Sequence, residues 1–355
     1  MKYVILISAI IFSTYLQAQT PVVLPQTAKG IAVDSKDNVI VRLFGRNSIM
    51  KISPEGKISY ITEDMTKGVN QGATPNGNIM AMDAKDNIYL IAGAYIWKVT
   101  PDGEVNLFAG NPNRSKSLEG LDGPKNTTQF NSIEFIEADP KGNIYIAEEV
   151  EGTTDNPGDY YVIRKINTDG LVSTLLNTRE NAALKTDWIS GMGVDSVGNI
   201  YLSDGRGRCI KKLAPDGTIT TLAGLCNKRK IKPFYITGDI SKAELMTPED
   251  ILVNKKGEII FSDGRLHRII KIANNNVSTI AGNSVIQPNS YNAQGRAKEG
   301  YKDGKALTAL FNFIPGGEMD IDSKQNIYVL DSGNDCIRKI SADGIVTTFA
   351  IRKRN

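Results

Sequence analysis

The sequence predicts an all-β protein, a six-bladed β-propeller built from four-stranded antiparallel blades. The first observation is that one pattern of residues recurs six times along the chain, and the second is that each copy contains four short strand-like segments. Self-similarity at this period is typical of repeat arrays and propellers, in which one unit cannot bury its own faces. The copies cover residues 30–61, 80–110, 135–176, 191–224, 250–282 and 317–350.

The fourth copy shows why each element is expected. Its first segment is apolar and uncharged, which suits a buried strand, and its second contains Ile and Tyr, which favour strands. Its third segment alternates apolar and basic residues, its fourth is rich in Thr, and Asp and Gly mark the turns. The predicted strands are 192–194, 199–203, 209–213 and 218–223, separated by a turn at 195–198, a loop at 204–207 and a turn at 215–217.

Matching turns support one closed ring in residues 19–355. The first turn recurs at 34–38, 83–87, 139–143, 254–258 and 322–326. A closed ring leaves few free strand edges. Two prolines in residues 21–25 confine that segment to an edge at best, and the sequence leaves open whether it adds a closing strand to the last blade.

Two motifs resemble those of the NHL-repeat family of β-propellers. They are Gly-Val-Asp-Ser-Val-Gly-Asn-Ile-Tyr-Leu-Ser-Asp at 193–204 and Asp-Cys-Ile-Arg-Lys-Ile at 335–340. The resemblance extends over nearly the whole chain after residue 18 and implies the propeller fold. It does not choose a function, because the family includes lyases, lactonase-like relatives and binding modules. The peptide-amidating lyases of this group use a zinc site with several histidines, whereas this chain has His267 alone.

The first 18 residues predict a secretory signal peptide, because Lys2 precedes a short apolar run and Ala18 offers a small residue for cleavage. We therefore expect an exported protein, periplasmic or extracellular, with no membrane span after signal removal. The formal net charge is only +3, and the basic residues are spread over the repeats, so nucleic-acid binding is not expected. A monomer is expected.

Three cysteines occur, at positions 209, 226 and 336, without metal-type spacing. Cys209 and Cys226 flank one predicted hairpin, so export would allow a disulfide between them if the geometry fits. The sequence leaves this pairing open.

The connections between copies predict where function lies. Turns after the first and third strands are short, whereas connections after the second and fourth strands are long and share one face of the ring. Loops on a rigid scaffold commonly carry function, so we expect the binding site on this loop-rich face. Two of the long connections repeat a theme, Asp122-Gly123 before Phe130 and Asp303-Gly304 before Phe311. A turn with a packing aromatic is favoured there over a calcium loop, because the full EF-hand spacing is missing.

An acidic residue ends the second strand in four neighbouring copies. These residues are Glu148, Asp204, Asp263 and Asp331. They could hold a divalent cation such as calcium through hard oxygen ligands, or each could cap its own loop by accepting backbone N–H bonds. The Gly residues that follow the three aspartates favour the local cap.

No catalytic set is recognisable in the sequence. One histidine leaves few options for a serine triad or a zinc site. We therefore predict a non-catalytic binding protein that holds a glycan, a peptide or a protein on the loop-rich face, with Arg206, Arg265 and Glu148 as ligand-binding residues. The alternative is a divalent-metal-dependent hydrolase or lactonase, similar to gluconolactonase-like propellers, with an acidic site at the channel mouth.

Overall fold

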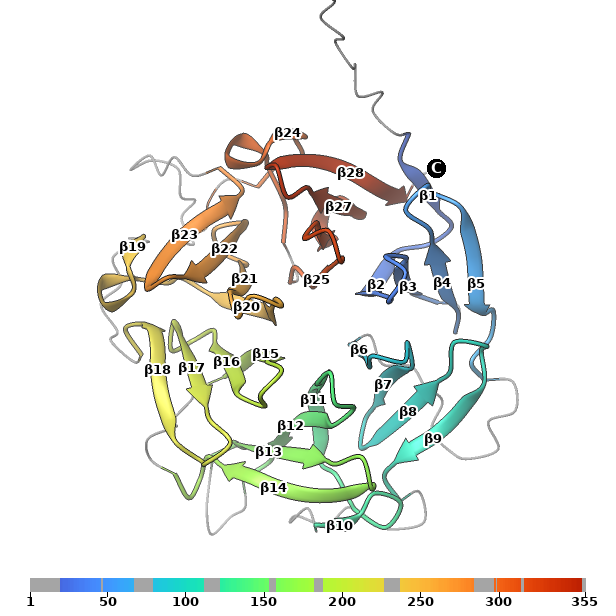
Figure 1. Cartoon of the computed structure of the whole chain (residues 1–355), viewed down its shortest axis with the longest axis vertical. Helices are drawn as coiled ribbons and strands as arrows, with labels where there is room; N and C mark the ends of the chain where they lie inside the picture. Colours follow the sequence, from blue (N-terminus) through green and yellow to red (C-terminus); the bar gives the residue numbers. More distant parts are fainter. Residues whose placement is uncertain are drawn as a thin grey trace, which may run out of the picture.

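The computed structural model confirms the predicted fold class: six blades are arranged in a ring (Figure 1). The structure describes residues 20–45, 47–66, 79–111, 122–152, 158–181, 188–226, 237–283, 297, 299–313 and 316–352. The predicted signal peptide lies outside these residues, as do most of the long connections. In the part of the chain that is described, no helix is long and apolar enough to cross a membrane.

Each blade has four antiparallel strands in chain order, with the first strand innermost (Figure 1). Blade 1 contains β2 (Ala28–Val33), β3 (Val39–Leu43), β4 (Ile49–Ile52) and β5 (Ile58–Thr62). Blade 2 contains β6 (Met80–Met82), β7 (Ile88–Ala92), β8 (Tyr95–Val99) and β9 (Val105–Ala109). Blade 3 contains β11 (Ser132–Ala138), β12 (Ile144–Val150), β13 (Tyr160–Ile166) and β14 (Leu171–Asn177).

The second half of the ring repeats this order. Blade 4 contains β15 (Ile189–Val194), β16 (Ile200–Asp204), β17 (Cys209–Leu213) and β18 (Ile219–Gly224). Blade 5 contains β20 (Pro248–Val253), β21 (Ile259–Asp263), β22 (Arg268–Ala273) and β23 (Asn276–Ala281). Blade 6 contains β25 (Met319–Ile321), β26 (Ile327–Asp331), β27 (Cys336–Ile340) and β28 (Ile345–Arg352). Short 3-10 turns are η2 (Ile240–Lys242), η3 (Ala306–Thr308) and η4 (Ser332–Asn334).

Additional strands cover the outer edges of three blades. β10 (Gly123–Pro124), β19 (Gly238–Asp239) and β24 (Gly304–Lys305) pair antiparallel with the outermost strands of blades 3, 5 and 6. The segment that the sequence left open, β1 (Val22–Leu24), pairs in parallel with β28, with Val22 opposite Ala350. The start of the described chain therefore closes the ring against its end (Figure 1).

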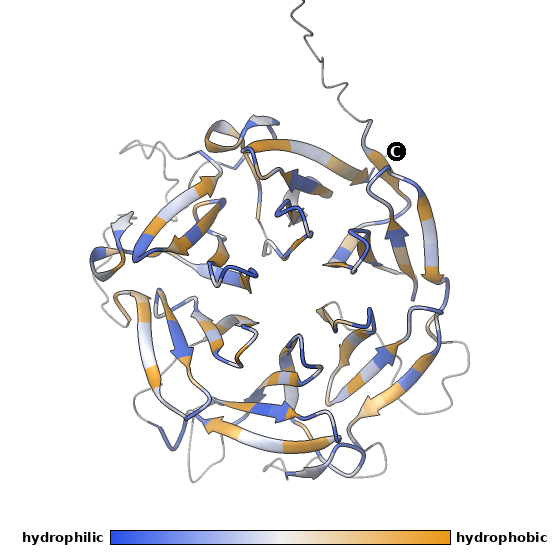
Figure 2. Ribbon diagram, viewed as in Figure 1, coloured by the Kyte–Doolittle hydropathy of each residue, from blue (hydrophilic) through white to orange (hydrophobic). Residues whose placement is uncertain are grey.

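The hydrophobic core lies between adjacent blades. Apolar side chains of one sheet pack on the next in clusters such as the one shared by Tyr201 of blade 4 and Phe261 of blade 5. Polar residues collect at the turns, and the strands contain both apolar and polar residues (Figure 2). This arrangement follows from the repeat, because a single blade leaves apolar side chains on both of its faces.

The shared first turn is held by one carboxylate. In blade 3, Asp139 accepts backbone N–H bonds from Lys141 and Asn143, and its other oxygen accepts from the Asn143 amide and the Tyr145 hydroxyl. The Asp, Asn and Tyr of the repeat motif thus form one hydrogen-bonded unit, which satisfies the polar groups of a tight turn.

The repeated Asp-Gly theme of the long connections has a structural role. Asp303 lies beside Arg338 of β27 and accepts a backbone N–H bond from Thr348 of β28. In blade 3, Asp122 likewise pairs with Arg164 and accepts a backbone N–H bond from Thr174. Phe311 and Phe130 each pack on the corresponding guanidinium, with 4.9 and 5.1 Å between Cζ and ring centroid. These contacts explain why Asp, Gly and Phe recur together.

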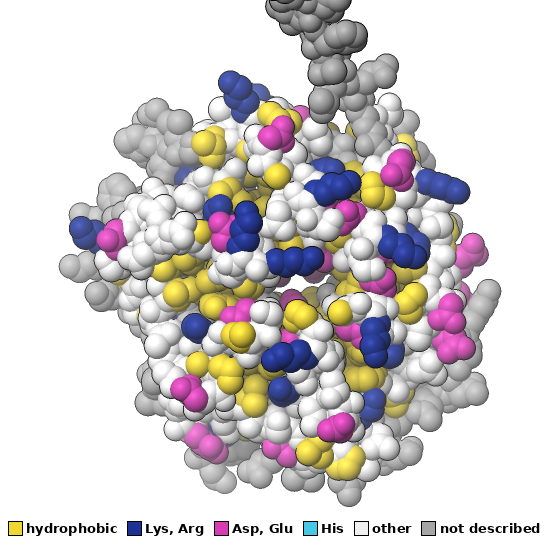
Figure 3. Space-filling model, viewed as in Figure 1, with side chains coloured by type: hydrophobic (Ala, Val, Ile, Leu, Met, Phe, Trp, Pro, Cys, Tyr) yellow, Lys and Arg dark blue, Asp and Glu magenta, His cyan; other side chains and the backbone are white. Residues whose placement is uncertain are grey.

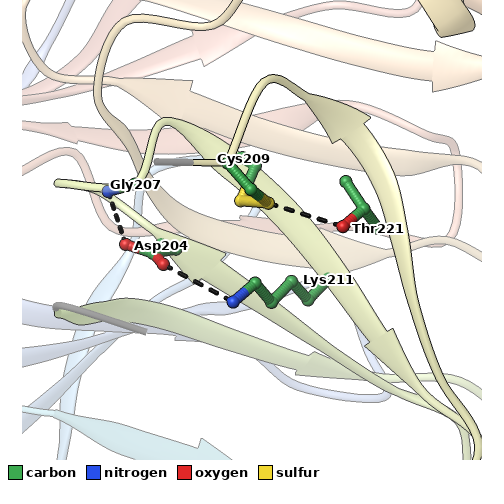
Figure 4. Close-up of a disulfide and its surroundings, with 6 residues drawn as sticks. Asp204, Gly207, Cys209, Lys211 and Thr221 are labelled. Carbon is green, nitrogen blue, oxygen red and sulfur yellow. Dashed lines mark hydrogen bonds and ion pairs between the residues drawn. A yellow bond between two sulfur atoms is a disulfide. The ribbon is translucent and has the colours of Figure 1, made fainter. Parts of the chain in front are cut away.

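Cys209 and Cys226 form a disulfide, with 5.2 Å between their Cα atoms. The bond ties the start of β17 to the segment after β18, next to the loop that Asp204 holds (Figure 4). Cys336 is a buried free thiol. The pairing that the sequence left open is therefore present in the structure.

Candidate channel-mouth binding site

The innermost strands line the channel with two tiers of side chains. Alternate residues of a strand face the same side, and in each blade two equivalent positions, two residues apart, lie at the channel. The first tier comprises Ile79, Phe135, Asp250 and Glu318, with Gly30 and Gly191 at the equivalent positions of the other two blades, and the second comprises Ala32, Ala81, Glu137, Gly193, Leu252 and Asp320. Carboxylates therefore enter the channel from blades 3, 5 and 6.

A cavity of about 510 Å³ occupies one mouth of the channel. Its walls come from residues that precede the innermost strands, including Ile79, Trp188 and Phe313, from Phe135 within β11, and from Gly264 and Arg265 just after β21. The residues before the innermost strands and those after β21 lie where the long connections join the blades, so the cavity opens on the loop-rich face. Figure 3 draws one face of the ring, on which charged side chains of both signs surround a central hollow.

The position of Trp188 is set by a close contact with Gly205. A Cβ atom added at Gly205 would lie 2.8 Å from Cζ3 of the Trp188 indole and 2.8 Å from the Ser190 hydroxyl. Only glycine therefore leaves room for the ring, and Gly264 accommodates the Glu249 carboxylate in the same way. Trp188 keeps 38% of its surface exposed, so one part of a fixed aromatic ring remains available at the cavity.

Gly191 and Gly193 let the innermost strands of blades 4 and 5 approach closely. A Cβ at Gly191 would lie 2.1 Å from the Glu249 carbonyl oxygen, and one at Gly193 would lie 2.7 Å from that of Ile251. Side chains at these two positions would force the innermost strands of the two blades apart.

The four channel carboxylates, Glu137, Asp250, Glu318 and Asp320, are half-buried. Burial raises the pKa of Asp250 to about 7, against the effect of its hydrogen bond from Met319. Burial, followed by repulsion from Asp250, raises the pKa of Glu318 well above its usual value. Burial likewise raises the pKa of Asp320 to about 6, and that of Glu137 well above its usual value. Of these four groups, Asp250 and Glu318 line the cavity, and near neutral pH such carboxyl groups can both donate and accept hydrogen bonds.

Each of the four predicted acidic residues is bound within its own blade. Glu148 accepts a backbone N–H bond from Asn131 and pairs with Arg164 at 3.1 Å. Asp204 accepts from the Gly207 N–H, and Lys211 lies 3.8 Å away (Figure 4).

The other two acids are held similarly. Asp263 accepts from the backbone N–H groups of Met246, Thr247 and Leu266. Asp331 accepts from the Asn312 N–H and pairs with Arg338. All four side chains are buried. These bonds fit the local cap that the sequence suggested as one of two roles.

No three His, Cys, Asp or Glu side chains form a group that could hold a metal ion within the described ranges. A calcium or other divalent site built from Glu148, Asp204, Asp263 and Asp331 would require these carboxylates to leave their present partners. The residues as placed do not fit such a site.

Of the three predicted ligand-binding residues, Arg265 lines the cavity, Arg206 lies beside Trp188, and Glu148 is buried elsewhere. Both arginines are exposed on the loops after the second strands of blades 4 and 5. Arg265 lines the cavity, and Cζ of Arg206 lies 6.0 Å from the centre of the Trp188 ring. Glu148 lies behind this surface, where its carboxylate faces Arg164.

His267 is buried and joins two blades. Its Nδ1 accepts a 3.1 Å hydrogen bond from the backbone N–H of Phe313, a residue of the cavity wall. The histidine therefore supports the site from behind.

The sequence reasoning missed Trp188, Glu249, Asp250 and Glu318. A signal for two of them was present, because Asp250 and Glu318 place charge in a strand position that is apolar or Gly in the other blades. Such a departure from a repeat commonly marks function. Trp188 precedes its strand and gives no periodic signal.

No family model matches the sequence, and no curated protein matches it. Solved structures match at the level of the fold. A protein of unknown function from Bacteroides thetaiotaomicron has a TM-score of 0.60 at 16% identity, over 91% of this chain and 70% of that one. An auxiliary nutrient binding protein from the same species has a TM-score of 0.59 at 14% identity, over 91% and 69%. A gluconolactonase from Xanthomonas campestris has a TM-score of 0.51 at 13% identity, over 93% and 88%.

These neighbours place the chain structurally among propellers that include both binding proteins and enzymes. Identities this low establish the fold and no activity. Membership of the NHL-repeat family stays a prediction from the sequence motifs.

Proposed function

We propose that this chain is an exported, non-catalytic binding protein that holds its ligand in the channel-mouth cavity of the loop-rich face. The observation that carries the proposal is the indole of Trp188, packed against Gly205 and partly exposed at the cavity. A pre-positioned aromatic ring beside a few polar groups is the usual composition of a small-molecule site.

The cavity chemistry favours a glycan over a peptide or protein ligand. A sugar ring has an apolar C–H face, which can cover an indole, and hydroxyl groups at its edge. Glu249, Asp250 and Glu318 line the same cavity, and carboxyl groups that share protons can both donate to and accept from hydroxyls. Arg265 adds a donor at the rim.

Export is supported by two independent features of the chain. The first 18 residues have the order of a signal peptide. The Cys209–Cys226 disulfide is typical of proteins that fold in an oxidising compartment. The proposed location is the periplasm or the extracellular medium.

A binding assay with matched variants tests this function. Wild type and the Trp188→Ala and Arg265→Ala variants would be applied to a glycan array and then titrated calorimetrically with the strongest hits. We expect both variants to weaken binding, Trp188→Ala by about thirty-fold or more, because removal of a central aromatic anchor commonly costs about 2 kcal/mol or more. Tyr60→Ala, an exposed aromatic on the outer strand β5, serves as the control and should bind as wild type does.

Other outcomes would redirect the proposal. Binding only to peptides or to a protein surface would assign the site to those partners. Hydrolysis of a lactone that depends on added divalent ion would favour the alternative, a metal-dependent hydrolase.

A further inference from the structure

A second charged cavity lies between blades 2 and 3, away from the channel. It has a volume of about 250 Å³ and adjoins a more open hollow of about 480 Å³. Lys98, Phe108, Lys125 and Gly170 line both. We call this continuous surface the lysine groove.

Lys125 is held in place within the lysine groove. Its backbone N–H donates to the Gly170 carbonyl, and its own carbonyl accepts from the Gly110 N–H, both at 2.9 Å. A Cβ at Gly170 would lie 3.3 Å from the Lys125 stem, and the Lys125 ammonium lies 3.8 Å from the centre of the Phe108 ring. The charge is therefore fixed by packing.

Lys98 differs from the equivalent lysines of three other blades in the contact that it makes. In those blades the third-strand lysine covers the second-strand tyrosine of its own blade. The pairs are Lys165 with Tyr145, Lys212 with Tyr201 and Lys339 with Tyr328, at 5.5, 5.8 and 5.4 Å from ammonium to ring centre.

In blade 2 the equivalent Tyr89 instead packs edge-on against Phe108, with 4.8 Å between the ring centres. No cation–π contact between Lys98 and Tyr89 occurs. Local departures from a repeated rule are where function is expected.

Lys98 and Lys125 line the same groove from different blades. Among the residues that the structure describes, neither Lys98 nor Lys125 has a carboxylate within ion-pair distance. Desolvation, followed by the charge of Lys98, lowers the pKa of Lys125. Exposed Lys85 and Lys141 add charge at the edge.

Two acids also line the lysine groove, and one of them is already engaged. The Asp83 carboxylate accepts from Asn87 and from the Tyr89 hydroxyl. Asp169 lines the more open hollow. Four lysines and two aspartates leave the surface positive.

We infer that the lysine groove binds an oxyanion, a sulfate or phosphate group, between Lys98 and Lys125. A doubly charged oxyanion would relieve the repulsion of two like charges brought together from different blades. The group could be a free inorganic ion or a substituent on a sugar, and both share this chemistry. The inference does not depend on the function proposed for the channel mouth.

Titration of the full mature protein with sodium sulfate, sodium phosphate and a sulfated monosaccharide tests the inference. Calorimetry at constant ionic strength would compare wild type with Lys98→Gln, Lys125→Gln and Lys212→Gln. Lys212 is the matched control, because it occupies the same strand position as Lys98 but covers a tyrosine. We expect saturable binding to wild type and to Lys212→Gln. Each groove variant should bind about five-fold or more weakly, since one close ionic contact is worth about 1 kcal/mol.

Comparison of the three ligands shows whether the groove binds a free inorganic ion or a charged group on a sugar. Preference for the sulfated sugar over both inorganic ions would assign the lysine groove to a charged glycan, and equal affinity would assign it to the oxyanion alone. Absence of saturable binding in wild type would overturn the inference. Equal loss in Lys212→Gln would do so as well, because it would show only a general effect of net charge.

Discussion

Asp250 of β20 accepts a 2.6 Å hydrogen bond from the backbone N–H of Met319 in β25, and so joins the innermost strands of blades 5 and 6. The same carboxyl group lines the channel-mouth cavity. One residue thus contributes both to the ring and to the proposed site.

The raised pKa of Asp250 predicts how stability varies with pH. Its pKa is about 7 in the fold and about 3.9 in an unfolded chain, so the folded state binds the proton more tightly. This contribution to stability is complete below about pH 4 and is lost as pH rises through about 7. Glu318, whose pKa is also raised, acts in the same direction.

Asp250→Asn should therefore flatten the fall in stability between pH 5 and pH 8. The amide oxygen can still accept the Met319 bond, but it carries no charge to desolvate. Between pH 5 and pH 8, the free energy of unfolding should fall by on the order of 1–3 kcal/mol less in the variant than in wild type. Urea unfolding at both pH values measures it. Parallel pH profiles for the two proteins would contradict the assignment.

The fold could be predicted from the sequence because each copy repeats the same local chemistry. Asp139, Asn143 and Tyr145 are close in the chain and form one turn unit, so their recurrence is visible directly. Closure by β1 was not predictable, since it pairs residues at opposite ends of the chain. Two prolines near β1 gave only the weaker indication of an edge.

The site was less predictable than the fold. The loop-rich face and Arg265 followed from the asymmetry of the connections, and Arg265 lines the cavity. Trp188 did not follow, because its position depends on a contact with Gly205 across a loop. A contact of this kind has no period in the sequence.

The buried pair of Asp331 and Arg338 should be costly to break on one side. Both side chains are fully buried and 2.8 Å apart, so Asp331→Leu removes the buried carboxylate partner of the guanidinium and leaves it only the more exposed Asp303. We expect a loss of about 3 kcal/mol in the free energy of unfolding. The double variant with Arg338→Met copies Leu43 and Met50 at the equivalent positions of blade 1 and should recover part of the loss. A double variant less stable than the single one would count against this account.

Stability should not depend on divalent ions, because the carboxylates of Asp204, Asp263 and Asp331 are bound to backbone groups of their own blades. Melting curves recorded with calcium and with a chelator should coincide. A bound ion at a concentration 100 times its Kd would instead add about 2.7 kcal/mol. A shift of that size in wild type, absent from Asp263→Ala, would restore the metal-dependent hydrolase.

The Cys209–Cys226 disulfide should stabilise the protein by about 3 kcal/mol, given the short loop that it closes. Urea unfolding with and without reductant measures this difference. Alkylation of the exported protein, denatured without reductant, should label Cys336 alone. Three labelled cysteines would show that the bond does not form.

Fluorescence titration tests the central claim, the binding role of Trp188, most directly. The chain has two tryptophans, and Trp97 is buried in blade 2, so a ligand in the cavity should change the emission of Trp188. With a glycan selected on the array, we predict a saturable change in wild type that is lost in Trp188→Phe. Calorimetry should then show weaker binding to Trp188→Ala. A glycan that binds Trp188→Ala and Arg265→Ala as tightly as wild type, with no change in emission, would contradict the channel-mouth site.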